Sequence, residues 1–325
     1  MRRPANPKIH AMRVHARLVC CIGLGYFLGL SACRAATPCK LVDLMPQYWQ
    51  SIDTSDAAAR IRAAVIEPYP DLYNENYVDL PTGDKWQATI AHEQAYAQTH
   101  RQEIAAADRY LSTNAQHFMK QFADTFLDFK CDFTFYIAPS FGRMDGSAAF
   151  VNGEHRIIFA PDVIPRYHDL SGLKVLIDHE TFHIYHHQAT GRFGASPEPV
   201  STILEALWSE GLATFVSWRM NPAASLDAAL LQPGIPEGAK PHLADIAKDL
   251  LAHLDTKDRP TYFRYFAAGK QPEGYPPRAG YYVGMLIAEE LSSRYSLMKL
   301  AHLNGPELRA SLVSELQTFA ATAKP

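Results

Sequence analysis

Residues 176–188 read LIDHETFHIYHHQ and place four histidines among apolar residues within thirteen positions. We predict that they lie on a helix, since an apolar run precedes them, Ser171 can cap its start and Gly191 can end it. The histidines then form either a metal site or a histidine-rich helix surface. No other stretch of the chain carries comparable chemistry, so this helix decides both the fold and the function.

The pattern HExxH occupies residues 179–183. On a helix, His179 and His183 lie on one face, one turn apart, so both imidazoles can bind one metal ion. Zinc suits two neutral imidazoles and leaves room for a third protein ligand and a water. Glu180 is rotated by about 100° from His179, which places it as a general base toward that water. We interpret His186 and His187 as surface residues or supports of the ligands, because they lie too far along the helix.

The third ligand is expected from the next predicted helix, residues 199–218. A histidine in the pattern HExxHxxGxxH is excluded, since Ala189 stands at that position. The helix offers Glu205 and Glu210. Small residues surround Glu210 and allow a close approach of two helices, whereas Trp208 flanks Glu205. We therefore favour Glu210, with Glu205 as the alternative.

The N-terminus has the pattern of a secretory signal. Residues 1–17 carry five Lys or Arg and no acid, and an apolar run occupies residues 18–30. That run is too short to span a bilayer, which needs about 20 residues. The run ends in Leu-Ser-Ala-Cys33, which resembles a bacterial lipobox with Cys33 as the lipidated residue. The alternative is ordinary cleavage near Ala35 or Ala36. We expect a periplasm-facing envelope lipoprotein or a secreted protein with its membrane contact through Cys33.

The composition limits the class of protein to which the chain can belong. It has 325 residues, 47% of them hydrophobic and 20% charged, with a net charge of −3. These values indicate a globular domain and give no argument for nucleic-acid binding. We predict one domain over residues 34–325. Cys39 and Cys131 remain after removal of the signal, and an oxidising compartment favours a disulfide between them over two buried thiols.

The expected fold class is α+β. Helices are predicted over residues 56–67 and about 86–128, a strand over 131–139, and mostly helix after 171. A hairpin is predicted at SAAFV (147–151), Asn152-Gly153 and HRIIFA (155–160), because Asn-Gly favours two-residue turns. The small sheet would pack on the HExxH helix, and HRIIFA would be the strand that pairs with an extended peptide.

HETFH together with the later WSEGLATFVS (208–217) resembles the gluzincin zinc metallopeptidases, notably bacterial secreted members. The resemblance covers roughly residues 145–295. It implies a zincin-like fold, zinc on His179, His183 and Glu210, and Glu180 as general base in peptide hydrolysis. One departure is Thr214, where some gluzincins carry an Asp that orients a ligand histidine, so another group must supply that support.

A later segment is expected to stabilise the oxyanion. Tyr281-Tyr282-Val283-Gly284 resembles the Tyr-x-x-Gly segment of the aminopeptidase branch, which points to Tyr281 as the phenol donor. Arg278 and Tyr282 lie beside it, and both tyrosines can also be read as core aromatics. His242 and His253 are weaker alternatives. The expected function is zinc-dependent hydrolysis of a peptide or protein substrate; the alternative is a zinc-binding envelope lipoprotein without turnover, in which Glu180 would have no role.

Overall fold

The computed structural model describes residues 38–192, 201–269, 271 and 275–321. The predicted signal and Cys33 lie outside the described residues. Within them, no helix combines the length and apolar character needed to cross a bilayer.

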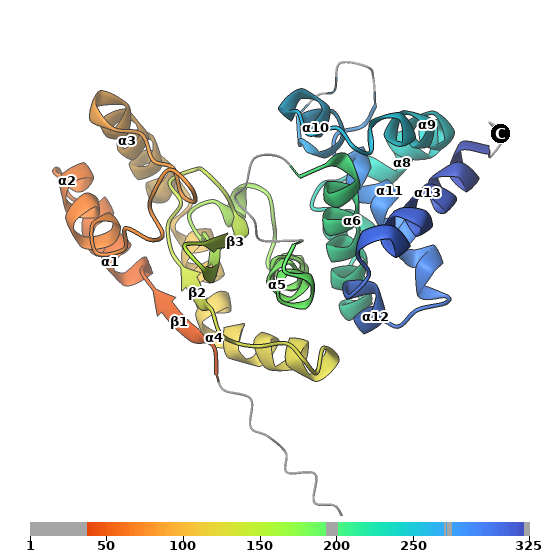
Figure 1. Cartoon of the computed structure of the whole chain (residues 1–325). Helices are drawn as coiled ribbons and strands as arrows, with labels where there is room; N and C mark the ends of the chain where they lie inside the picture. The colour runs from red at the N-terminus through yellow and green to blue at the C-terminus, as the bar shows by residue number, and fades with distance from the viewer. Residues whose placement is uncertain (1–37, 193–200, 270, 272–274, 322–325) are drawn as a thin grey trace, which may run out of the picture. The chain divides into compact units, whose positions relative to one another are not determined.

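A four-stranded mixed sheet forms the smaller part of an α+β fold (Figure 1). Its strands, in sheet order, are β1 (Lys40–Asp43), β2 (Thr134–Ile137), β4 (Glu154–Phe159) and β3 (Gly146–Val151). β1, β2 and β4 are parallel, and β3 is antiparallel to β4. Asn152 and Gly153 have φ of 53° and 81°, as a tight hairpin turn requires. The predicted hairpin is therefore confirmed.

Two features of the sheet differ from the sequence-based expectations. HRIIFA corresponds to β4, which lies between β2 and β3 and has no free edge, so its predicted pairing with a peptide is wrong. β3 is an edge strand instead, because β4, which follows it in the chain, lies between it and β2. β1 has no counterpart in the sequence-based prediction, since KLVD is too short to show alternation.

A disulfide joins Cys39 to Cys131 across the starts of β1 and β2, with Cα atoms 4.8 Å apart. This pairing confirms the prediction from the cysteine count. The bond links two segments 92 residues apart in sequence, and the helices between them are thereby closed into one loop.

The N-terminal helices pack around the sheet, and the last of them ends beside the C-terminal helices, with Phe122 and Phe126 in their core. They are α1 (Met45–Ile52), α2 (Ala57–Ile61), a π-helical turn (Arg62–Ile66), α3 (Gly83–Thr99) and α4 (Arg101–Thr125). The single helix expected over residues 86–128 is two helices. They meet at His100, whose backbone leaves the helical conformation at φ −112° and ψ 26°.

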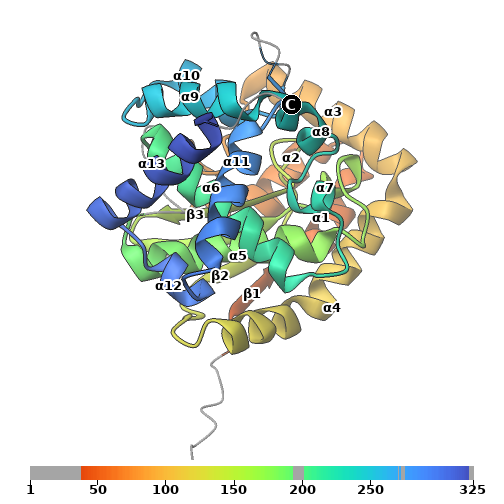
Figure 2. The same ribbon diagram turned by 90° about the vertical axis from the view of Figure 1, so that its right-hand side faces the viewer.

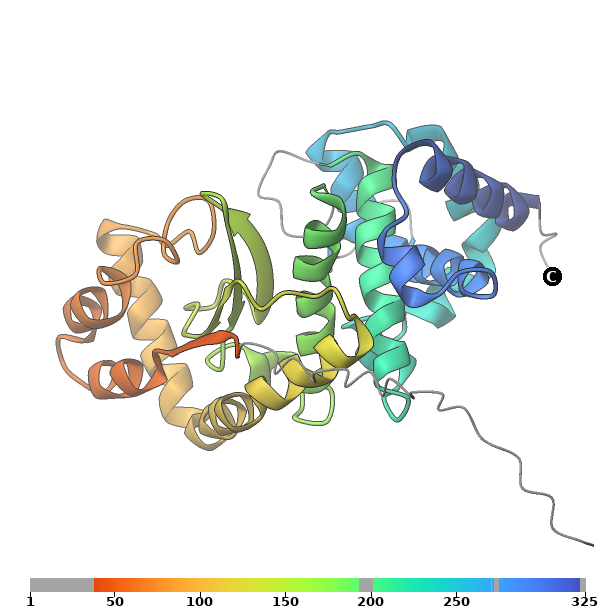
Figure 3. The same cartoon turned by 60° about the horizontal axis from the view of Figure 1, so that its bottom comes forward.

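α5 (Leu173–Thr190) carries HExxH and lies between two hydrophobic cores. Leu176 and Ile177 pack in the core of the sheet, while Phe182 and Tyr185 pack in the core of the C-terminal helices. Figure 3 shows α5 beside α6, with the sheet on its other side. Gly191 ends α5 in a left-handed conformation at φ 65°, as predicted, but the N-cap is Gly172 and not Ser171.

The C-terminal half is helical, as expected, and Figure 2 looks onto it. It contains α6 (Ile203–Met220), α7 (Leu226–Ala229), α8 (Ile235–Ala239), α9 (Leu243–His253), α10 (Arg259–Phe266), α11 (Ala279–Ser292), α12 (Leu297–Ala301) and α13 (Gly305–Ala321).

α6 and α11 touch backbone to backbone. A Cβ added at Gly211 would lie 2.3 Å from the Cα of Gly284, and one added at Gly284 would lie 2.3 Å from the carbonyl oxygen of Leu207. Real atoms do not approach so closely, so both positions require glycine. The small residues around Glu210, with Gly211 next to it, were expected to admit the helix that carries HExxH, but Gly211 admits α11. This contact fixes where α11 presents its side chains relative to Glu210.

Candidate metal centre

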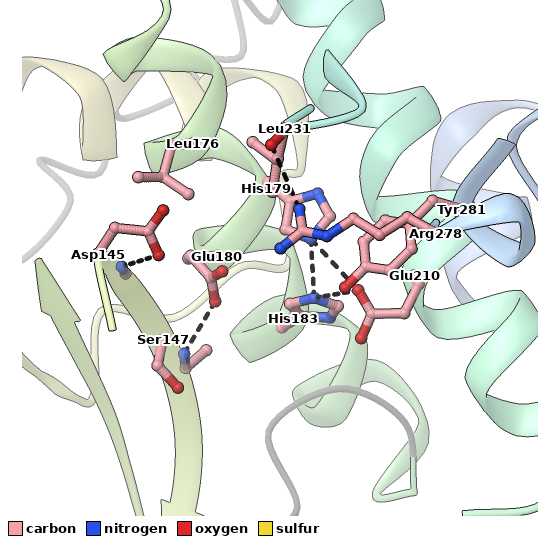
Figure 4. A pocket seen from close by; sticks show the side chains of 12 residues that line it. Asp145, Ser147, Leu176, His179, Glu180, His183, Glu210, Leu231, Arg278 and Tyr281 are labelled. Carbon is pink, nitrogen blue, oxygen red and sulfur yellow. Dashed lines mark hydrogen bonds and ion pairs between the residues drawn. The ribbon is translucent and has the colours of Figure 1, made fainter. Parts of the chain in front are cut away.

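Three side-chain atoms from α5 and α6 converge on one point. The Nε2 atoms of His179 and His183 are 3.2 Å apart, and each lies 3.4 Å from Oε2 of Glu210. One turn of α5 separates the imidazoles, and α6 brings the carboxylate across from the facing helix (Figure 4). This group could hold a metal ion. Among the described residues it is the one cluster of at least three His, Cys, Asp or Glu with that property.

Burial and mutual interactions shift the pKa values of all three groups. Burial lowers the pKa of His179 to about 4, which keeps its imidazole neutral. Burial also opposes protonation of His183, but the charges of Glu210 and Glu180 outweigh it and raise its pKa. Burial would raise the pKa of Glu210, yet the two histidines hold it well below its usual range. The cluster thus combines one anionic oxygen with two imidazoles drawn toward it.

The outer nitrogens of the two histidines have different surroundings. Nδ1 of His183 is 3.3 Å from the hydroxyl oxygen of Ser209, one residue before Glu210. Nδ1 of His179 is buried and has no hydrogen-bond partner among the described residues. The hydroxyl of Thr214 donates back to the carbonyl of Glu210 at 2.8 Å, and not to either ring. Ser209 is therefore placed to orient the ring of His183, the role that was not expected of Thr214.

Glu205, the alternative ligand, lies elsewhere. It closes a capping box at the start of α6, where Thr202 and Glu205 each accept a backbone N–H of the other. It also forms an ion pair with Arg192. The signal was present in the sequence, because Thr202-Ile-Leu-Glu205 matches the capping-box pattern. That pattern assigns Glu205 to the helix terminus and leaves Glu210 for the cluster.

Glu180 faces the sheet side of the cluster. Its Oε2 accepts the backbone N–H of Ala148 at 2.9 Å, and burial raises its pKa to about 7. Asp145, at the start of β3, lines the same cavity. Its carboxylate accepts the N–H of Gly146 at 2.9 Å and pairs with Nε2 of His168 at 2.6 Å. Sequence reasoning missed Asp145, since nothing in its neighbourhood marks a site.

Tyr281 and Arg278 form the opposite side. The ring of Tyr281 lies parallel to that of His179 at 6.1 Å, and burial together with Glu210 raises its phenol pKa well above the usual range. Arg278 reaches into the cavity from the N-terminus of α11, with its guanidinium carbon 5.2 Å from the Tyr281 ring (Figure 4). Tyr282 is 3% exposed and packs in the core of the C-terminal helices. Of the two tyrosines, only Tyr281 lines the cavity.

The remaining histidines lie outside the cluster. His186 is fully buried, so the interpretation as a surface residue is wrong for it. His187 is half-buried and its Nδ1 lies 2.8 Å from Nε2 of His155 on β4. His242 and His253 do not line the cavity.

The cavity has a volume of about 300 Å³. It contains a cluster that could hold a cation, a carboxylate of raised pKa on one side, and a phenol and a guanidinium on the other. Such a site can polarise a bound carbonyl, accept a proton from water and donate hydrogen bonds to a developing negative charge. No profile of a known protein family, no curated protein and no solved structure matches the chain.

Proposed function

We propose that the protein is a zinc-dependent hydrolase of peptide bonds, with a gluzincin-type site on a zincin-like fold. The observation that carries the proposal is the size of the triangle formed by His179, His183 and Glu210. Ligand atoms about 2.0–2.1 Å from a tetrahedral zinc lie about 3.3–3.4 Å from one another. The three atoms lie 3.2 to 3.4 Å apart.

Zinc in this position supplies Lewis acidity, which polarises a carbonyl and lowers the pKa of water. Glu180 is the proposed general base. It lies one residue from His179 but faces the sheet side, so it takes the proton of the attacking water and returns it to the leaving amine. Its raised pKa of about 7 suits a group that must both accept and release a proton near neutrality.

β3 is the proposed binding strand for the substrate. It is an edge strand, and the N–H of Ala148 points away from β4 toward Glu180. An extended peptide can add to such an edge by backbone hydrogen bonds. Binding there would bring a substrate carbonyl between Glu180 and the cluster.

Tyr281 is the proposed donor to the oxyanion. Its phenol stays protonated because burial and the charge of Glu210 raise its pKa. It lines the cavity on the side opposite Glu180. A hydroxyl placed there can donate to the carbonyl oxygen as charge develops on it.

The proposed location is the bacterial cell envelope, with a lipid anchor on Cys33. The Cys39–Cys131 disulfide supports an oxidising compartment. Mass spectrometry of the mature N-terminus should show an acylated Cys33. A free N-terminus at Ala36 or Thr37 would replace the anchor by ordinary secretion.

The test of the function combines metal content with cleavage. The purified protein should contain about one zinc per chain, in line with a single tetrahedral site, and should cut members of a peptide library. Glu180→Gln should keep the zinc and lose about 10²- to 10⁴-fold in rate. Glu289→Gln is the matched control, because Glu289 is exposed on α11. Zinc without any cleavage by the wild type would favour the zinc-binding lipoprotein without turnover.

A further inference from the structure

The charged groups of the cavity are unequally paired. Each of its three acids has a partner: Asp145 pairs with His168, Glu180 accepts the N–H of Ala148, and Glu210 faces the two histidines. Arg278 is the one Lys or Arg among the residues that line the cavity. Because the three acids already have partners, the charge of Arg278 has none of them to pair with. This indicates that a ligand brings the negative group.

Most hydrogen-bonding capacity of Arg278 is unused. A guanidinium has five N–H donors. Its one acceptor among the described residues is the carbonyl of Leu231, at a long 3.5 Å, and its buried Nε has no partner there. No carboxylate of the described residues forms an ion pair with it, and one face of the group lies over the Tyr281 ring. The guanidinium N–H groups that face the cavity are available to a ligand, and a carboxylate can accept from two of them at once.

The backbone that holds this guanidinium is itself unusual. Arg278 and Leu231 have φ of 54° and 56°, and they are two of the four non-glycine residues with positive φ in the described part of the chain. Both line the cavity and contact each other. Left-handed backbone is unfavourable for such residues and tends to persist at functional sites. At Arg278 it is the N-cap of α11 that adopts it.

We propose that Arg278 binds a carboxylate of the substrate, borne by a residue next to the bond that is cut. This rests on the proposed function and names its substrate class: peptides with an acidic group beside the scissile bond. The guanidinium lines the same cavity of about 300 Å³ as His179 and Glu180. That volume is at the low end for ligand pockets, so a carboxylate on Arg278 belongs to the reacting residue or its neighbour. Its source is either the C-terminal α-carboxylate or an Asp or Glu side chain.

The test measures binding, so that it does not depend on turnover. Calorimetry with the Glu180→Gln protein would compare three probes: acetyl-tetra-alanine with a free C-terminus, the same peptide as its C-terminal amide, and an amide with Asp as its last residue. The free acid or the Asp peptide should bind about 10- to 100-fold more tightly than the plain amide. Tighter binding of the free acid alone would identify the α-carboxylate as the source. Tighter binding of the Asp amide would identify the side chain.

Adding Arg278→Gln to that protein should bring the affinity ratio close to one, whereas Arg278→Lys should keep part of it because the charge remains. Gln and Lys meet the same backbone strain as Arg at this positive φ, so neither variant changes it. Thermal unfolding would verify that both variants fold. Arg309→Gln is the matched control, since Arg309 lies outside the cavity and pairs with Asp255. Equal losses for acid and amide would mean that Arg278 only positions Tyr281, and the proposal would be overturned.

The outcomes also separate the two proposals. An acid preference that depends on Arg278, without peptide cleavage by the wild type, retains this inference and rejects the hydrolase. Cleavage without an acid preference, or no measurable binding of any acidic probe, rejects the inference and leaves the hydrolase standing.

Discussion

The two walls of the cavity are built in different ways. The helical wall, from α6 and α11, is held by backbone contact at Gly211 and Gly284 with no room for a side chain. The sheet wall, from β3 and the segment before it, is held by hydrogen bonds, such as that from Ala148 to Glu180. Packed backbones fix a position, whereas a hydrogen bond can be exchanged. The carboxylate of Glu210 therefore has a fixed place, while Glu180 can change partners when a substrate arrives.

The largest expected effect is on zinc binding by Glu210, which belongs to the helical wall. Glu210→Gln should weaken zinc binding by more than about 100-fold, which exceeds the usual effect of losing a support of a ligand. Glu205→Gln should keep the metal and lower the free energy of unfolding by less than about 1 kcal/mol, because Gln can still accept the N–H of Thr202 and only the ion pair with Arg192 is lost. Metal titration by competition with a chelator measures the first effect and confirms that Glu205→Gln retains the metal. Equal metal affinities would remove Glu210 from the site.

The next effect concerns the phenol of the helical wall. Tyr281→Phe should lower kcat by about 10²- to 10³-fold, as removal of an oxyanion donor does, and leave the zinc content unchanged. Tyr282→Phe is the control, because Tyr282 is buried in the core and loses only a hydroxyl. Steady-state kinetics on a cleaved library peptide measures both. Normal kcat in the Tyr281 variant would take α11 out of the reaction.

The two walls can be compared directly by one substitution in each. Gly284→Ala should lower the free energy of unfolding by about 3 kcal/mol, because its Cβ meets the backbone oxygen of Leu207 and α11 must move. At Gly146 an added Cβ would lie 3.2 Å from the Phe159 ring, and a small shift of that ring relieves the contact. Gly146→Ala should therefore change the free energy of unfolding by less than about 1 kcal/mol. Denaturant unfolding gives both values. Similar losses would contradict the distinction between the walls.

The smallest effect is on pH dependence. Burial lowers the pKa of His186 well below 6.5, the ordinary value, and the nearby His183 and His187 add to this. The unfolded chain then binds a proton that the folded chain does not, so stability falls as pH drops below about 6.5. His186→Gln should flatten this slope more than Glu289→Gln, which removes no such group. Unfolding at pH 5 and 7.5 measures the difference, and identical slopes would contradict it.

Much of the site was predictable because HExxH acts within one helix. The spacing of His179 and His183 fixes their common face, and the small residues near Glu210 indicated close helix packing. The capping box at Thr202 could have removed Glu205 from consideration. These signals are local, so they survive without knowledge of the tertiary fold.

The features that could not be predicted from the sequence depend on contacts between distant parts of the chain. β1 becomes a strand only by pairing with β2, and the edge position of β3 depends on sheet order. Asp145 enters the cavity because β3 begins beside α5, and the left-handed backbone of Arg278 has no sequence marker. The break between α3 and α4 at His100 is also not marked by a proline or glycine.

The disulfide has a consequence for the order in which the chain folds. It joins segments 92 residues apart, and contacts between such distant segments form slowly. The cluster on α5 and α6 joins neighbouring helices of the chain instead. We expect the helical pair to form early and the parallel pairing of β1 with β2 to come last, sealed by oxidation. Pulsed hydrogen exchange during refolding of the reduced chain should protect α5 and α6 before β1, and simultaneous protection would reject this sequence of events.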